Sequence, residues 1–137
     1  MMLPAGLRFK TYLLISMMVA FGPLGDVLLG KGMKQIGALS NWTPAGLFRF
    51  FNSAFGSTTV WLGIGSLFAF FLAYILVLSW ADYSFVQPAS SVAYGVVALL
   101  GYLVLRETIT PTRWAGIAII CAGVFIVGQT PPRTTEP

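Results

Sequence analysis

Four segments of this chain are each long and apolar enough to cross a lipid bilayer, and they restrict the fold more than any other feature. They cover residues 11–32, 59–81, 84–105 and 111–129. A transmembrane helix needs about 20 mostly apolar residues at a rise of about 1.5 Å each. Since lipid offers no hydrogen-bond partner to an open sheet edge, each segment is expected to form a helix. The sequence therefore predicts an all-α membrane protein with four transmembrane helices.

The composition excludes a water-soluble globule. Of the 137 residues, 57% are hydrophobic and 9% are charged, whereas soluble domains carry about 25% charged residues. The net charge of +4 is interpreted as a signal of loop topology, so no nucleic-acid partner is expected. Histidine is absent and Cys121 is the one cysteine. These counts argue against an enzyme with catalytic residues, a metal site or a bound cofactor.

The segments outside the four spans have distinct characters. Residues 1–10 are interpreted as an N-terminal segment before the first span and not as a signal peptide, because the following apolar stretch is too long and no cleavage site follows it. In the long first connection, Thr43 and Pro44 suit the start of a short helix. Trp42 and neighbouring phenylalanines predict that this helix lies in the membrane interface, with Arg49 turned to water. The polar, proline-rich tail of residues 130–137 is expected to be disordered.

Orientation in the membrane is weakly encoded. With four spans, both termini lie on one side, and that side carries three basic residues, whereas the other side carries five. The positive-inside rule therefore favours termini outside by a small margin.

Asp26 is the only charge between residues 12 and 29. An ionised group in hydrocarbon costs about 2.5–3.5 kcal/mol on insertion scales and is by default a functional-site hypothesis. The functional interpretation is a coupling site for a proton or cation, or a counter-charge for a substrate amine. The alternative is a structural partner for a lysine, but Lys31 and Lys34 lie about 140° and 80° round an ideal helix from Asp26. Pro23 could kink the helix just before Asp26 and so open a cavity.

Other polar residues inside the spans are candidates for a substrate site. Gln87, Ser91 and Tyr94 follow helical spacing in the third span, where Pro88 could open the backbone. The alternative for this polar stripe is hydrogen bonding between helices. Tyr74 in the second span either faces the same cavity or packs between helices.

Three basic residues near the membrane surface are candidates for contact with lipid headgroups: Lys31, Lys34 and Arg49. They could bind a phosphate group as it enters from the surface. The alternative is that they are ordinary interfacial residues whose charged ends reach water.

Several runs of residues resemble a known family. Residues 25–35 resemble the end of helix one in four-helix members of the drug/metabolite transporter superfamily. In its small multidrug resistance branch, a glutamate–valine pair precedes a lysine eight residues later, as Asp26-Val27 precedes Lys34. Residues 116–124 resemble that branch's helix-four dimerisation signature. Residues 105–116 and 81–90 resemble the glutamate-bearing turn and the entry into helix three of EamA-type domains.

The resemblance implies dimers of four-helix units in the bacterial inner membrane, surrounded by membrane lipids. Gly116 and Gly123 share one helix face, and small residues let membrane helices approach closely. The implied interface, with the same chain or a related subunit, comprises Gly116, Ile120, Gly123 and Val124.

Three functions remain open. The leading hypothesis is transport of a small amphipathic or cationic substrate with Asp26 as the binding or coupling acid. The chain lacks the third-helix tryptophan of the multidrug branch, and Pro88 with the EamA-like turn is similar to short subunits that move lipid-linked aminoarabinose, although those often lack the helix-one acid. The second hypothesis is therefore a flippase subunit for a polyprenyl-phosphate-linked sugar or another lipid. The third is a non-transporting structural subunit of a larger membrane complex.

Overall fold

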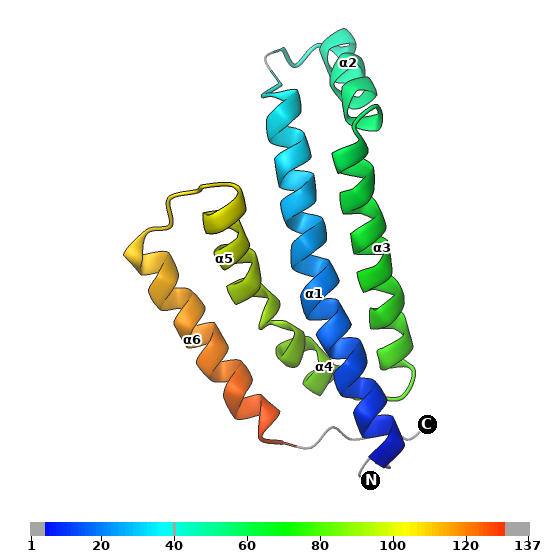
Figure 1. The fold of residues 1–137 in the computed structure, drawn as a ribbon, viewed down its shortest axis with the longest axis vertical. Coiled ribbons are helices and arrows are strands. Elements are labelled where there is room, and N and C mark those ends of the chain that lie inside the picture. The colour runs from blue at the N-terminus through cyan, green and yellow to red at the C-terminus, as the bar shows by residue number, and fades with distance from the viewer. Residues whose placement is uncertain (1–4, 40, 131–137) are drawn as a thin grey trace.

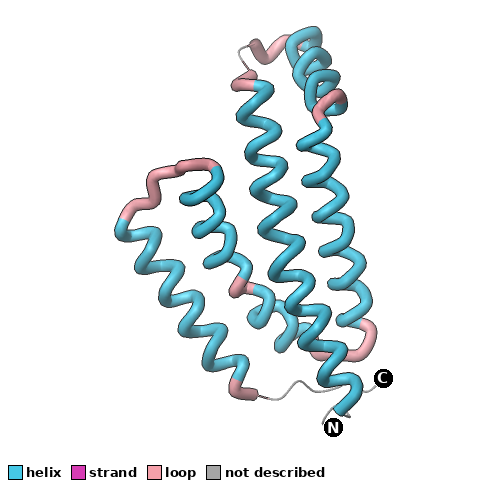
Figure 2. The backbone as a smooth tube through the Cα atoms, in the orientation of Figure 1, coloured by secondary structure: helices cyan, strands magenta, loops and turns pink. Residues whose placement is uncertain are grey.

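The structure is a computed structural model that describes residues 5–39 and 41–130, and over those residues it contains helices and loops but no strand (Figures 1 and 2). Its helices are α1 (Ala5–Ile36), α2 (Pro44–Phe55), α3 (Thr58–Leu78), α4 (Tyr83–Ser90), α5 (Ala93–Val104) and α6 (Pro111–Gly128). Four helical units are long and apolar enough to cross a membrane: α1, α3, α4 together with α5, and α6. The predicted all-α membrane fold is confirmed.

Helix α1 is longer than the predicted span of residues 11–32 at both ends. Hydropathy detects only the part of a helix that suits lipid, and the flanking residues include good helix formers and no proline within Ala5–Lys10 or Met33–Ile36. The helix ends at Ile36, and the next residue, Gly37, has a φ of +92°, the left-handed conformation that glycine adopts most readily. The N–H of Gly37 donates to the carbonyl of Met33 at 3.1 Å. Residues 1–4 and most of the predicted disordered tail lie outside the described residues.

Helix α2 begins as the sequence predicts. The hydroxyl of Thr43 accepts a hydrogen bond from the N–H of Gly46 at 3.2 Å, and Pro44 is the first helical residue. Phe48 is 74% exposed and Phe51 is 56% exposed, so this helix presents aromatic side chains outward, and Trp42 just before it is 83% exposed. Its position in a membrane interface stays a prediction.

Helices α1 and α3 run side by side along most of their length (Figure 1) and pack through glycine. A Cβ added at Gly63 would lie 2.9 Å from the backbone nitrogen of Leu29 and 3.1 Å from the carbonyl oxygen of Gly25. The two backbones can approach this closely only because Gly25 and Gly63 have no side chain, and the side chains of Leu67 and Leu29 pack against these glycines. The hydroxyl of Ser66 also donates across this contact to the carbonyl of Phe21 at 3.1 Å.

The buried core lies where α4 joins this helix pair, beside the beginning of α1 and the end of α3 (Figure 1). Its members are all apolar and at most 2% exposed: Met18, Ala73, Val77, Ala81 and Val86. The indole N–H of Trp80 donates to the hydroxyl of Thr11 at 2.9 Å, so this polar pair is satisfied in an apolar setting.

The third predicted span, residues 84–105, is two helices and not one. The helical conformation is interrupted by a turn at Ser91 and Val92, between α4 and α5. The hydroxyls of Ser90 and Ser91 both donate to the carbonyl oxygen of Gln87, at 2.8 Å and 3.1 Å. The N–H of Ser91 donates instead to the carbonyl of Pro88, one residue short of the α-helical partner. Local hydroxyl bonds of this kind compete with helical bonding, so the sequence Gln-Pro-Ala-Ser-Ser interrupts the span.

Helix α6 lies at the outer edge of the molecule, beside α5 and α4 (Figure 1). None of its 18 residues is buried within the described part of the chain. Ile119 is 73% exposed and Phe125 is 71% exposed. Such a large apolar surface requires lipid or another polypeptide to cover it.

Substituting Gly63 by alanine should destabilise the protein, whereas Gly65→Ala in the same helix should not. A Cβ at Gly63 meets backbone atoms, while a Cβ at Gly65 meets nothing within 4 Å. We expect Gly63→Ala to cost about 1–3 kcal/mol through overpacking and Gly65→Ala to be neutral or stabilising by up to about 1 kcal/mol. Thermal unfolding of both variants in detergent, followed by circular dichroism, measures the difference. Equal melting temperatures would contradict the glycine contact.

Candidate functional site

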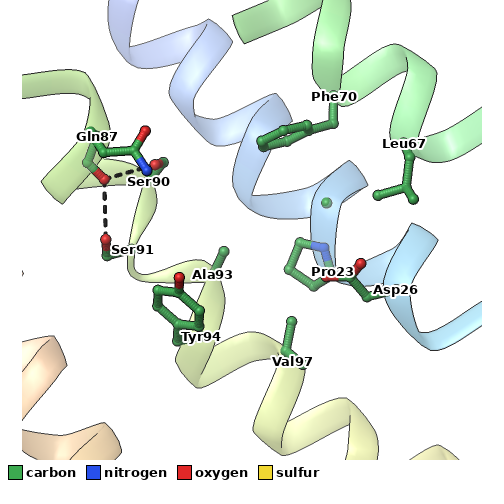
Figure 3. Close-up of a pocket in the computed structure, with 11 residues that line it drawn as sticks. Pro23, Asp26, Leu67, Phe70, Gln87, Ser90, Ser91, Ala93, Tyr94 and Val97 are labelled. Carbon is green, nitrogen blue, oxygen red and sulfur yellow. Dashed lines mark hydrogen bonds between the residues drawn. The ribbon is translucent and has the colours of Figure 1, made fainter. Parts of the chain in front are cut away.

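A cavity of about 310 Å³ lies between α1, α3, α4 and α5. We call it the Gln87 cavity. Gln87, Ser91 and Tyr94 form its polar wall, and Pro23 and Asp26 lie across from them on α1 (Figure 3). The structure thus brings together four of the predicted site residues, although Asp26 and the other three are more than 60 residues apart in the sequence.

The break between α4 and α5 shapes the polar wall. Because the hydroxyl hydrogens of Ser90 and Ser91 are used on the Gln87 carbonyl, their oxygens are left as hydrogen-bond acceptors. A ligand donor such as an ammonium or a sugar hydroxyl suits this wall.

Tyr74, the fifth predicted residue, does not line the cavity but supports its wall. Its ring stacks on that of Phe70, with centroids 6.1 Å apart, and Phe70 lines the cavity. The hydroxyl of Tyr74 lies 3.5 Å from Oε1 of Gln87, which is a long hydrogen bond. Tyr74 is therefore placed to orient Gln87 and not to touch a ligand directly.

Asp26 lies at the junction of two cavities. It lines the Gln87 cavity and also a second cavity of about 320 Å³ between α1, α5 and α6, together with Val97. Among the described residues, Asp26 forms no salt bridge, and neither Lys31 nor Lys34 is its partner. The structural alternative for Asp26, a lysine at the helix end, therefore finds no support in these residues.

We call the second cavity the Arg113 cavity. Two of its charged residues are not among the predicted site residues. Glu107 and Arg113 both line it, at the end nearest the loop between α5 and α6. Glu107 stands in the glutamate-bearing turn of residues 105–116, and Arg113 is one of the five basic residues counted for topology. One signal could have singled out Arg113. It lies in the first turn of a helix, where the macrodipole disfavours a positive charge.

Lys34 pairs with Glu107 across this end of the molecule. The Lys34 ammonium donates to Oε1 of Glu107 at 2.7 Å, and the two side chains are 55% and 48% exposed. The hydrogen bond and then the charge of Lys34 lower the pKa of Glu107, and the charge of Arg113 adds to this. Arg106, with φ of +52°, turns the loop back, and the N–H of Glu107 donates to the carbonyl of Gly101 at 3.1 Å.

The three predicted headgroup contacts lie in different places. Lys31 is exposed on α1. Lys34, besides its pairing with Glu107, keeps half of its side chain accessible. Arg49 lines a smaller cavity of about 210 Å³ between the end of α1 and α2. The structure does not gather these bases into one anion site, and over the described residues it shows no group of side chains that could hold a metal ion.

Three of the four predicted interface residues on α6 are open to the surroundings. A Cβ at Gly116 or Gly123 would meet nothing within 4 Å, and Ile120 is 40% exposed. Val124 is half-buried. The inner side of α6 is marked by Cys121, whose sulfur would lie 3.3 Å from a Cβ at Gly95 of α5.

Curated relatives of this chain carry one name, "Probable 4-amino-4-deoxy-L-arabinose-phosphoundecaprenol flippase subunit ArnE". The protein of this name from Pseudomonas savastanoi is 34% identical over 77 residues, which are 56% of this chain and 68% of the relative. The one from Pseudomonas fluorescens is 27% identical over 92 residues, 67% of this chain and 79% of the relative. The one from Proteus mirabilis is 38% identical over 68 residues, 50% of this chain and 56% of the relative. No protein-family model matches the chain, and no solved structure matches it significantly.

The Glu107 carboxyl should titrate below its ordinary pKa of 4.5, and Lys34→Gln should raise that value. Because the folded-state pKa is lowered, the pair stabilises the fold above the unfolded value, and this contribution is lost as pH falls through the folded pKa. Carbon-13 NMR of glutamate-labelled protein measures it, since Glu107 and Glu136 are the only glutamates. Lys31→Gln is the matched control and should leave the titration unchanged. An unaltered pKa in Lys34→Gln would show that the ion pair does not form.

Proposed function

We propose that this chain, which belongs to the family of ArnE flippase subunits within the drug/metabolite transporter superfamily, is a subunit of a flippase for a polyprenyl-phosphate-linked amino sugar. The chain is an integral membrane protein by its four spans, and we place it in the bacterial inner membrane. The names of the relatives support the second hypothesis from the sequence better than the leading one, transport of a small amphipathic or cationic substrate. In this role it is a transporter subunit and not an enzyme.

The observation that carries the proposal is the position of Asp26 between two cavities beside an interrupted helix. The substrate in the relatives' name bears a sugar amine, which is a cation near neutral pH. A carboxylate within an apolar span is costly unless it meets water, a partner or such a cation. Asp26 therefore supplies the counter-charge for the amine, and the acceptor oxygens of the Gln87 wall accept from the sugar hydroxyls.

The lipid tail of the substrate needs no protein path of its own. Helix α6 packs on α4 and α5 along one side only, so the cavities lie close to the surrounding lipid. The headgroup enters the cavities while the polyprenyl chain stays in the bilayer. The interrupted third span permits rearrangement around the site, as discontinuous helices do in other transporters.

The open glycine face of α6 suits the second subunit. A second copy of this chain, or a related four-helix subunit, would cover Gly116, Ile120 and Gly123. Close helix approach through small residues is the usual basis of association where no hydrophobic effect operates between helices. The word "subunit" in the relatives' name is consistent with such an assembly.

Asp26→Asn should lower translocation of the lipid-linked amino sugar about tenfold to a hundredfold, because a hydrogen bond to a charged group contributes about 1.5–3 kcal/mol. The measurement is the appearance of the amino sugar on the far leaflet of proteoliposomes. Asp82→Asn is the matched control, since Asp82 lies at the α3–α4 turn and lines neither cavity. If wild-type protein moves a small cation but not the lipid, the leading sequence hypothesis replaces this proposal.

Gly123→Leu should weaken subunit association, and Gly128→Leu should not. Both positions have open space for a side chain, but only Gly123 shares the face of Gly116. Energy transfer between two differently labelled copies in liposomes measures the association. Wild-type copies that show no transfer would exclude the homodimer and leave the heterodimer. Loss of transfer in Gly128→Leu as well would contradict the assigned face.

A further inference from the structure

We propose that the Arg113 cavity binds the zwitterionic headgroup in one orientation, with the phosphate on Arg113 and the sugar amine on Asp26. This inference rests on the proposed function and assigns the two opposite charges of the substrate to two residues of this chain. It also fixes which end of the protein the phosphate faces.

The charges that line this cavity leave one acid and one base for a ligand. The charged lining residues are Asp26, Glu107 and Arg113. Glu107 is paired with Lys34 at 2.7 Å, and the charge of Arg113 adds to the lowering of the pKa of Glu107 without forming a salt bridge to it among the described residues. Over the described residues, neither Asp26 nor Arg113 has a salt-bridge partner. A ligand that bears one cation and one anion therefore matches what remains.

Arg113 has the chemistry and the position for a phosphate. A guanidinium offers a planar fork of N–H donors that matches phosphate oxygens, and it remains charged at all relevant pH values. Its place in the first turn of α6 opposes the helix macrodipole, so helix stability does not account for it. The hydroxyl of Thr110 accepts from the backbone N–H of Arg113 at 3.4 Å and holds this turn in place.

Asp26 lies where this cavity adjoins the Gln87 cavity, eight residues along α1 from Lys34, which pairs with Glu107 of the α5–α6 loop. It stands near the end of the apolar run of residues 12–29. Because Asp26 also lines the Gln87 cavity, a sugar whose amine reaches it has the Gln87 wall within reach for its hydroxyls. The volume of about 320 Å³ lies at the lower end of the range for ligand sites, about 300–1,000 Å³, and suits one sugar phosphate.

The arrangement predicts a sidedness. The phosphate of the lipid faces the end of the molecule that contains the α5–α6 loop (Figure 1), where Glu107 pairs with Lys34 of α1. The amine lies deeper along α1, at Asp26, eight residues before Lys34. The lipid is therefore bound from the leaflet on the side of the α5–α6 loop.

The test is binding of three lipids to the full chain in lipid nanodiscs, followed by fluorescence of the tryptophans, which include Trp114 beside Arg113. The lipids are undecaprenyl-phosphate-linked 4-amino-4-deoxyarabinose, its N-acetylated form, and undecaprenyl phosphate. Arg113→Gln should weaken all three about tenfold to a hundredfold. Asp26→Asn should weaken only the amino form, so that the amino and N-acetyl forms bind alike.

Two further variants separate charge from folding. Arg113→Lys keeps the charge without the fork and should recover part of the affinity that Arg113→Gln loses. Arg106→Gln removes a base from the neighbouring loop that lines neither cavity, and it should bind all three lipids as the wild type does. Inorganic phosphate at the same concentration should not displace the lipids. If it does, and only with Arg113 present, the site takes free phosphate and the assignment to the headgroup is overturned.

The remaining outcomes distinguish an error in the headgroup orientation from an error in the proposed flippase function. If wild type binds the lipids and prefers the amino form, but Arg113→Gln binds them equally well, the orientation is wrong and the flippase function stands. The same conclusion follows if Asp26→Asn weakens all three lipids alike. If wild type binds none of the three, the proposed function itself fails.

Discussion

The close backbone contact between α1 and α3 at Gly25 and Gly63 determines where the functional groups point. In lipid there is little hydrophobic drive between helices, so van der Waals packing at such glycine positions is what fixes one helix against the other. Once Gly25 faces α3, helical geometry turns Asp26 about 100° away, toward α5. Asp26 therefore faces the two cavities because the residue before it, Gly25, is the one packed against α3.

The rest of the molecule is attached to this helix pair more loosely. Helix α5 contacts α1, while α6 packs chiefly on α4 and α5. The ion pair between Lys34 and Glu107 joins the ends of the two halves, but it is half exposed, and exposed pairs contribute little to stability. A firm pair of helices next to a lightly held pair is a suitable basis for a carrier, because the second pair can move without unfolding the first.

The sequence predicts the features that depend on local chemistry. The four spans follow from hydropathy, and the cap at Thr43 follows from residue type, as the structure confirms. Thr110 caps α6 in the same way. The break at Ser91 was not predicted as a break between two helices, because the competing hydroxyl bonds depend on side-chain geometry that hydropathy does not contain. The pairing of Lys34 with Glu107 could not be predicted, because the two residues are 73 positions apart in the sequence. Helical geometry could exclude lysine partners for Asp26, but it could not identify another partner. Arg113 was overlooked because a base at a span end is ordinarily a topology signal.

In the proposed function, charge balance links the site to the work of moving a headgroup through the bilayer. Moving one elementary charge across a membrane potential costs or yields about 2.3 kcal/mol per 100 mV. A phosphodiester-linked amino sugar carries one negative and one positive charge, and Asp26 and Arg113 carry the complementary two. When both pairs form, each charge is neutralised locally and the loaded site has no net charge. Desolvation is then offset pair by pair. The membrane potential does no net work on the headgroup because its own two charges cancel. An acid alone, as in a carrier of simple cations, would leave the phosphate without a counter-charge. Arg113 in the same cavity is therefore the feature that distinguishes a flippase for the amino sugar lipid from a carrier of simple cations.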